Sequence, residues 1–236
     1  LQVTRNLRTQ AAFRIEQTET NGTGARFPPT FLPPPNQPTV FPVDRRFMPI
    51  SASAGLLYDL PHDIVARATL QHVERAPDPI ELFYKGPHDT PRTFEIGDPT
   101  MTLEKANTVE LGLKRARGDT RFALSIYHTR DQYFIFKNFT GVRCSESFAS
   151  CGTPGATYDQ IIYAQRDARF TGGEIQIEHD VARVWNGVFG VEAQYDIVHA
   201  IFLDGSFVPK IPPQRLGGGV YYRDASWTAR VNLLHA

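Results

Sequence analysis

This chain of 236 residues has no long apolar run, no excess of charge of either sign and only two cysteines. The 25 Lys and Arg balance the 25 Asp and Glu, so the net charge does not attract nucleic acid or an anionic membrane surface. No run of about 18 apolar residues occurs, which excludes a transmembrane helix. A membrane barrel stays possible, because its alternating strands keep the mean hydropathy low.

Signals of processing and of catalysis are also missing. The chain begins at Leu1 without an initiator Met or a signal peptide, so we expect it to be processed or excised. It contains no GxSxG, no HxxxH or HExxH spacing, and no GxGxxG that follows a strand and opens a helix, the patterns typical of several hydrolases, metal enzymes and nucleotide-binding enzymes. We therefore predict no catalytic residues, no enzyme and no cofactor.

The two cysteines lie close together. Cys144 and Cys151 occur in RCSESFASCG, a polar segment with Gly. Such a pair is typical of a small disulfide loop formed in an oxidising compartment. The alternative is two free thiols. A zinc or redox site is disfavoured, because no His is adjacent and no CxxC occurs.

Period-two alternation of apolar and polar residues runs through the whole chain and predicts strands with one apolar and one polar face. The polar face is charged in both signs. A soluble sandwich also shows polar outer faces, so alternation alone does not decide between sandwich and barrel. The nine alternating segments lie within residues 7–16, 47–59, 64–71, 109–114, 121–126, 174–178, 189–195, 216–222 and 227–233.

The connections alternate between short and long, which is the rhythm of an outer-membrane barrel with short periplasmic turns and long extracellular loops. A sandwich with Greek-key links would not keep this rhythm. Tight turns fall near residues 61–62, 117–119, 183–186 and 223–225. The long connections, which we predict to be extracellular, are residues 19–45, 77–103, 138–157 and 202–212.

Two further features bear on the barrel hypothesis. Residues 21–42 are rich in Pro, which predicts an exposed loop without a stable element of its own. Aromatic residues toward strand ends suit the girdles at membrane interfaces, although core packing is the alternative. These aromatics are Tyr133, Phe134, Phe136, Tyr221, Tyr222 and Trp227.

The most distinctive sequence motif lies at residues 74–114, ERAPDPIELFYKGPHDTPRTFEIGDPTMTLEKANTVELGLK. It resembles a signature of TonB-dependent outer-membrane receptors, in which a strand ends in RAP, a loop carries ELF, GPH and TFEIGDP, and the next strand contains EK and ELGL. Three later stretches are similar to the same family: YAQRDARFTGGEIQIEH, VPKIPPQRLGGGVYY and WTARVNLLHA.

The resemblance implies an all-β fold, an antiparallel transmembrane β-barrel in the outer membrane of a Gram-negative bacterium. Such receptors have roughly 22 strands around a plug. We expect residues 1–236 to be a partial barrel of about nine strands, taken from the later middle of the barrel, without plug or final strands. The implied partners are outer-membrane lipid, the protein's own plug domain, which is absent here, and the TonB energy-transducing complex acting through that plug.

The resemblance also implies active transport of a scarce nutrient, and the wording around GPH and FEIGD is closest to a metal-uptake branch. His88, Asp89 and Glu95, with Asp98 nearby, are the candidate substrate- or metal-binding residues, because imidazole and carboxylates suit divalent transition metals. Zinc, an iron siderophore or haem would be the transported ligand. The alternative is that His88 follows a Pro turn and the acids accept hydrogen bonds from loop amides.

Charged residues on the polar face are interpreted as solvated lumen groups that contact the plug, rather than as catalytic acids and bases. Two other functions stay open at this point: a passive porin-like barrel, and a soluble all-β binding or carbohydrate-active domain. The charged residues are Arg67, Glu110, Arg121, Glu174, Glu178, Glu192 and Arg230.

Overall fold

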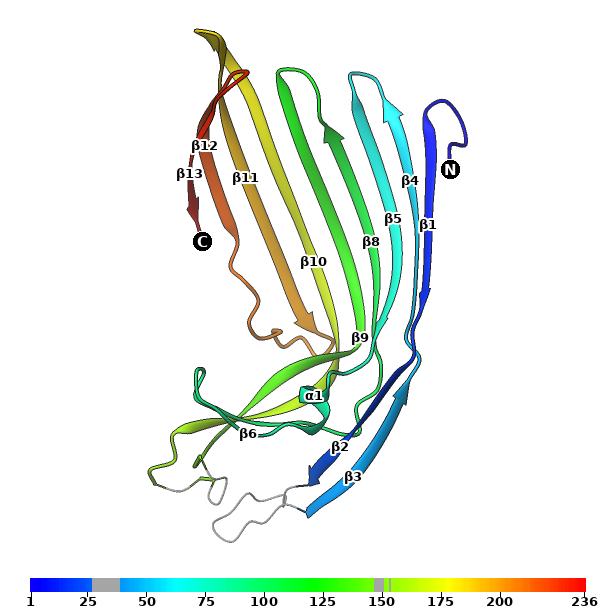
Figure 1. The fold of residues 1–236 in the computed structure, drawn as a ribbon, viewed down its shortest axis with the longest axis vertical. Coiled ribbons are helices and arrows are strands. Elements are labelled where there is room, and N and C mark those ends of the chain that lie inside the picture. The colour runs from blue at the N-terminus through cyan, green and yellow to red at the C-terminus, as the bar shows by residue number, and fades with distance from the viewer. Residues whose placement is uncertain (27–38, 147–150, 153) are drawn as a thin grey trace.

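A computed structural model describes residues 1–26, 39–146, 151–152 and 154–236. The described residues form a separate two-stranded sheet and a large curved sheet (Figure 1), whose main antiparallel path contains nine strands. In order across the sheet these are β1 (Leu7–Ile15), β4 (Ile50–Leu60), β5 (Ile64–Arg75), β8 (Glu104–Arg115), β9 (Thr120–Cys144), β10 (Tyr158–Val184), β11 (Gly187–Phe202), β12 (Arg215–Arg223) and β13 (Thr228–His235).

Each of the nine predicted segments overlaps one of these strands and extends beyond it by at most three residues, so the predicted all-β antiparallel fold is confirmed. Within the described residues the sheet is not closed, because β1 and β13 form its two edges. In the same part of the chain, no helix is both long and apolar enough to cross a membrane.

The alternation places aliphatic side chains in register across one side of the sheet, which we call the apolar face. Leu56 is paired with Ala68, Ala68 with Leu111 and Leu111 with Ile126. Leu56, Leu111 and Ile126 are each about half exposed. Soluble monomers rarely expose a continuous apolar surface of this extent, whereas a membrane barrel presents one to lipid.

Short turns and long connections lie at opposite ends of the sheet (Figure 1). The turn between β4 and β5 is tight, with His62 and Asp63 both at positive φ. At the other end lie the hairpin of β2 (Thr18–Arg26) and β3 (Thr39–Phe47), the short helix α1 (Pro79–Phe83), and strands β6 (Lys85–His88) and β7 (Thr93–Ile96). The short-and-long rhythm predicted from the sequence is therefore present in the fold.

The prediction that residues 21–42 have no stable element is wrong for the part the structure describes. β2 and β3 pair in an antiparallel hairpin from Thr18–Phe47 to Arg26–Thr39. Lys85 Nζ donates to the Thr23 carbonyl over 3.2 Å, so contacts with another connection stabilise the hairpin. Residues 27–38 lie outside the described residues.

The connection predicted at 138–157 is shorter than expected, because β9 continues to Cys144 and β10 begins at Tyr158. These extensions bend away from the barrel wall at the end that carries the long connections (Figure 1). Residues 147–150 and 153 of this connection lie outside the described residues.

The girdle interpretation is wrong for Phe136 and Tyr221, which are only 8% and 2% exposed. The ring of Phe136 lies 4.6 Å from that of Phe202, and the Tyr221 hydroxyl donates to Asp180. Core packing therefore explains Phe136, whereas contacts with charged groups of the polar face explain Tyr221. Trp227, by contrast, is exposed at the short-turn end, where an interfacial aromatic is expected.

Candidate functional site

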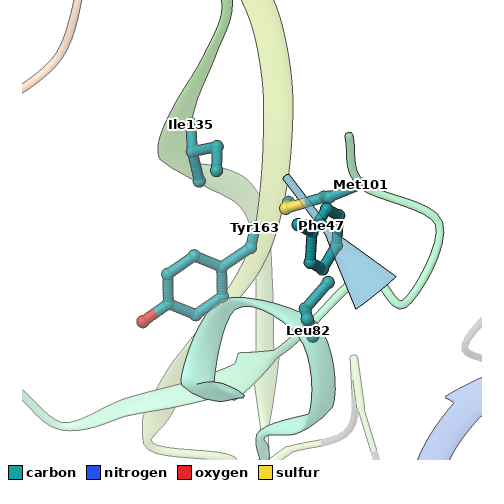
Figure 2. Packing of buried hydrophobic residues seen from close by; sticks show 5 residues of the cluster. All are labelled: Phe47, Leu82, Met101, Ile135 and Tyr163. Atoms are coloured by element: carbon teal, nitrogen blue, oxygen red, sulfur yellow. The ribbon is translucent and has the colours of Figure 1, made fainter. Parts of the chain in front are cut away.

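The long connections pack into one structure, which we call the loop unit: the β2–β3 hairpin, residues 76–103 and the bent ends of β9 and β10. β7 pairs in parallel with Asp159–Ile162 of β10, and β6 pairs with β7. Figure 2 shows the hydrophobic core of the loop unit, to which each segment contributes at least one side chain. This core consists of Phe47, Leu82, Met101, Ile135 and Tyr163.

An ion-pair cluster fixes the loop unit to the barrel wall. Arg75, at the end of β5, donates from Nη1 to Glu81 Oε2 over 2.9 Å and from Nη2 to Glu104 Oε2 over 3.1 Å. Glu81 also accepts from the Asp78 amide over 2.8 Å, which completes a capping box at the start of α1. Glu104 Oε2 accepts from the Ile135 amide over 2.7 Å. Arg75 thus joins the RAP, ELF and EK parts of the sequence signature.

Gly97 in the FEIGD part of the signature permits a close approach between backbones. Its amide donates to the Tyr84 carbonyl over 2.7 Å, and the next amide, that of Asp98, donates to the Glu81 carbonyl over 2.8 Å. A Cβ at Gly97 would lie 2.6 Å from the carbonyl carbon of Leu82. Only glycine fits here without a shift of the backbone.

Glu95 is a buried carboxylate, 1% exposed, held by three good donors. It accepts from Lys137 Nζ over 2.7 Å, from the Tyr163 hydroxyl over 2.9 Å and from the Thr93 hydroxyl over 2.9 Å. Burial by itself raises the pKa of Glu95, but the hydrogen bonds from Lys137, Tyr163 and Thr93 outweigh it and leave the pKa below its ordinary value. Glu95 is therefore an anion at neutral pH.

The structure brings His88 and Glu95 together but not Asp89. His88 Nδ1 lies 3.3 Å from Glu95 Oε1, and the imidazole is half exposed. Asp89 instead accepts from the Tyr158 hydroxyl over 2.9 Å, and Asp98 accepts from the amide of Thr100 over 2.8 Å. Among the described residues no group of three His, Cys, Asp or Glu side chains is arranged to hold a metal ion.

The two cysteines form a disulfide in the structure. Both are buried and pack against Phe94 and Ile96 of β7. The amide nitrogen of the buried Gln160 side chain lies 3.5 Å from Cys144 Sγ. The disulfide therefore closes the far end of the loop unit beside β7.

Sequence reasoning missed three residues that shape this region: Arg75, Lys137 and Tyr163. Arg75 carried a readable signal, since it lies in the RAP motif. Lys137 and Tyr163 stand 42 and 68 positions from Glu95, and nothing in the local sequence relates them to it. They meet only because β9 and β10 extend beyond the barrel wall.

Charged residues on the polar face pair with one another near the short-turn end. Arg121 lies 2.8 Å from Asp180 and 3.2 Å from Glu178. Arg230 lies 2.9 Å from Glu178 and 2.8 Å from Glu192. A cleft of about 280 Å³ is lined in part by these groups. These ion pairs link β9, β10, β11 and β13 across the polar face.

The other predicted polar-face residues behave in the same way. Arg67 and Glu110 form an ion pair between β5 and β8. Ser125 donates to Glu174 over 3.5 Å between β9 and β10.

Residues 1–235 match the family model described as "TonB dependent receptor-like, beta-barrel". Among solved structures, the chain is similar to the copper transporter OprC with a TM-score of 0.73 and 19% identity, over 97% of this chain and 32% of that one. It is also similar to the hemophore receptor HasR of Serratia marcescens, solved with its hemophore HasA and heme, with a TM-score of 0.60 and 14% identity over 96% of this chain and 41% of that one.

A third similar structure is the ferric-catecholate import receptor Fiu from E. coli K12, with a TM-score of 0.55 and 18% identity over 97% of this chain and 32% of that one. At these identities the likeness concerns the fold. The chain spans about a third of the length of OprC and of Fiu.

Proposed function

The chain belongs to the TonB-dependent receptor-like β-barrel family, and from this membership we propose that it forms part of a receptor that actively imports a scarce nutrient. The family's barrels lie in the outer membrane of Gram-negative bacteria and act as transporters, not enzymes. The proposed partners are a plug domain inside the barrel, the TonB energy-transducing complex acting on that plug, and the imported substrate.

One observation carries the proposal: the sheet separates an apolar face from a charged face, and a packed loop unit covers only one of its ends (Figure 1). An apolar face in contact with lipid and a charged face toward a lumen are what a membrane barrel requires. We propose that the loop unit is extracellular and that the charged network of Arg121 and Arg230 on the polar face contacts the plug. Loops held by a rigid scaffold are where binding residues concentrate.

For the substrate we propose a transition-metal ion or a metal chelate, contacted by His88. Glu95 lies at His88 Nδ1, and a carboxylate at one ring nitrogen is the usual support for a histidine whose other nitrogen binds metal. Among the described residues Nε2 has no hydrogen-bond partner. Glu95 is engaged by Lys137, Tyr163 and Thr93, so its role is to orient the imidazole rather than to bind the metal itself.

A single imidazole is a modest donor set, and it suits a metal that arrives with its other ligands already bound. Asp89 would have to release the Tyr158 hydroxyl, which donates to its carboxylate, before it could contact the metal. Three similar structures were described as a copper transporter, a receptor in complex with a heme-carrying hemophore and a ferric-catecholate receptor. These similar receptors support metal-bearing substrates as the class to test first.

The test uses the full-length receptor in its native cells, with uptake of labelled copper, zinc, an iron siderophore and haem measured under metal limitation. Replacing His88 with Ala should lower uptake of one of these about tenfold, the effect of losing one supported metal contact. Replacing His62 with Asn is the matched control: it removes an imidazole at the opposite end, where the positive φ suits Asn. Uptake of all four substrates at the unaltered rate in the H88A receptor would sink the metal assignment.

Energy dependence separates active import from a passive pore. Active import predicts that uptake falls to background when the TonB complex is disrupted, whatever the substrate. Uptake that continues unchanged in those cells would favour a porin-like barrel and contradict the transport proposal, independently of the result for His88.

A further inference from the structure

Two arginines face each other directly across strands β9 and β10. Arg130 is the cross-strand partner of Arg169, and both side chains are exposed. Within the part of the chain that the structure describes, neither guanidinium has an ion-pair or hydrogen-bond partner, although 19 ion pairs form elsewhere. Like charges directly opposite on adjacent strands repel one another. No contact within the described residues therefore offsets the repulsion between these two arginines.

The arginine pair lies on the apolar face, at its border toward the loop unit. Along β9, Arg130 follows Ile126 and His128 at alternate positions, and all three side chains are exposed. Along β10, Arg169, Thr171 and Ile175 likewise lie at alternate positions that share this face, and their side chains are exposed. The aliphatic surface thus ends in a row that carries two unneutralised positive charges.

Polar groups that can donate hydrogen bonds surround the pair on the same face. His128 and Thr171, paired across the strands one row nearer the aliphatic surface, are hydrogen-bonded to each other over 2.8 Å. Asn107 is the neighbour of Arg130 on β8 and lies 2.8 Å from His72. The border therefore combines cationic and neutral hydrogen-bonding groups next to an apolar surface.

We propose that Arg130 and Arg169 bind the phosphate group of a membrane lipid whose acyl chains lie along the apolar face. Arginine suits this role because its planar fork donates two parallel hydrogen bonds to phosphate oxygens, and basic residues at a membrane surface attract anionic lipids. The phosphate neutralises the two guanidinium groups, and the aliphatic rows beyond Ile126 receive the chains. The proposal rests on family membership, which places this face against lipid, and not on the nature of the imported substrate.

The test uses the full-length receptor purified in dodecyl maltoside and titrated with dioctanoyl phosphatidic acid. Replacing both arginines with Gln (R130Q/R169Q) should weaken binding about 30-fold, the combined effect of two basic residues at an anionic lipid surface. The matched control R14Q/R46Q removes two charges from exposed arginines elsewhere, each 70% exposed, and should bind as the unaltered receptor does.

Further measurements separate lipid from other ligands and guard against misfolding. Without lipid, R130Q/R169Q should melt at or above the temperature of the unaltered receptor, because the repulsion is gone; phosphatidic acid should then raise only the unaltered receptor's Tm. Native mass spectrometry of the unaltered receptor should show retention of phosphatidic acid over dioctanoylglycerol. Equal retention of the two lipids, binding of inorganic phosphate as tight as that of the lipid, or an unchanged affinity in R130Q/R169Q would each overturn the proposal.

Discussion

Replacing Arg75 with Met should loosen the loop unit from the barrel wall while the sheet stays intact. Arg75 is the only cation within hydrogen-bond distance of Glu81 or Glu104 among the described residues. The two carboxylates are 15% and 16% exposed. The substitution therefore leaves two largely buried anions facing each other without a counter-charge, whereas methionine retains the apolar packing of the arginine stem.

The magnitude follows from the burial of this cluster. Removing one partner of a fully buried ion pair destabilises a protein by about 3–5 kcal/mol, whereas exposed pairs contribute at most about 1 kcal/mol. Arg75 itself is 39% exposed, so we expect an intermediate loss of about 2 kcal/mol in the local stability of the loop unit. A loss of this size corresponds to about 30-fold faster amide exchange, because the exchange rate is proportional to the opening equilibrium constant when the opened state recloses quickly.

The assay is amide hydrogen exchange of the full-length receptor in detergent, read by mass spectrometry on peptides from residues 76–103 and from β8. R75M should accelerate exchange in the first peptide about 30-fold and leave the second unchanged. R143M breaks an exposed pair with Asp159, 67% and 51% exposed, and should change exchange less than about twofold. R75M/E81Q/E104Q, which removes the stranded charges, should recover part of the protection.

Two results would refute this reasoning. If R75M protects residues 76–103 as well as the unaltered receptor does, the ion-pair cluster does not hold the loop unit. If R75M/E81Q/E104Q exchanges faster than R75M, then lost hydrogen bonds rather than uncompensated charges destabilise the variant.

Two further predictions concern the same unit. Replacing Gly97 with Ala should destabilise the loop unit by about 1–3 kcal/mol, because the new Cβ would lie 2.6 Å from the Leu82 backbone. G86A is the control, since its Cβ would lie no nearer than 3.9 Å to any other atom. Equal resistance of the two variants to protease on heating would contradict this prediction. The lowered pKa of Glu95 means that its contribution to stability is complete above the unfolded-state pKa of about 4.3 and is lost as pH falls through the folded-state value. Relative to cleavage of an unfolded substrate at the same pH, pepsin cleavage of the unit should therefore rise as pH falls below about 4, and E95Q, already destabilised at neutral pH, should lack this step.

The barrel wall could be predicted from the sequence because its two faces meet different surroundings. Each strand must alternate apolar and polar residues to match the surroundings of the two faces, and the period-two pattern in the sequence shows this alternation directly. The turn between β4 and β5 was equally legible from Pro61 and His62. The continuation of β9 from residue 138 to Cys144 was not predictable, because the alternation is interrupted in the bent end, where Tyr133 has a positive φ.

The loop unit could be predicted only in part. Helix α1 has five residues, too few for a helical period, although Asp78 and Glu81 form a capping box that the sequence displays. The β2–β3 hairpin looked like a loop because the sequence between its two strands is rich in Pro, and its support comes from Lys85, far along the chain. Tertiary contacts of this kind leave no local pattern.

Asp89 lies apart from His88 and Glu95 for a related reason. His88 and Asp89 are adjacent in sequence, which suggested a shared ligand set. Strand β6 ends at His88, and the chain then turns so that the Arg92 amide donates to the Asp89 carbonyl over 3.1 Å. The turn directs the Asp89 carboxylate to Tyr158 while His88 stays beside Glu95.

The position of the signature residues also limits what the signature can reveal about the substrate. Arg75, Glu81 and Gly97 are engaged in ion pairs and close backbone contacts inside the loop unit, so any receptor that builds this unit needs them, whatever it imports. Resemblance through these residues therefore identifies the scaffold. Selection among substrates must depend on side chains that the scaffold leaves exposed, and His88 is such a residue because Glu95 engages only one of its two ring nitrogens. We expect receptors with the same scaffold but a different residue at this position to differ in the substrate they import.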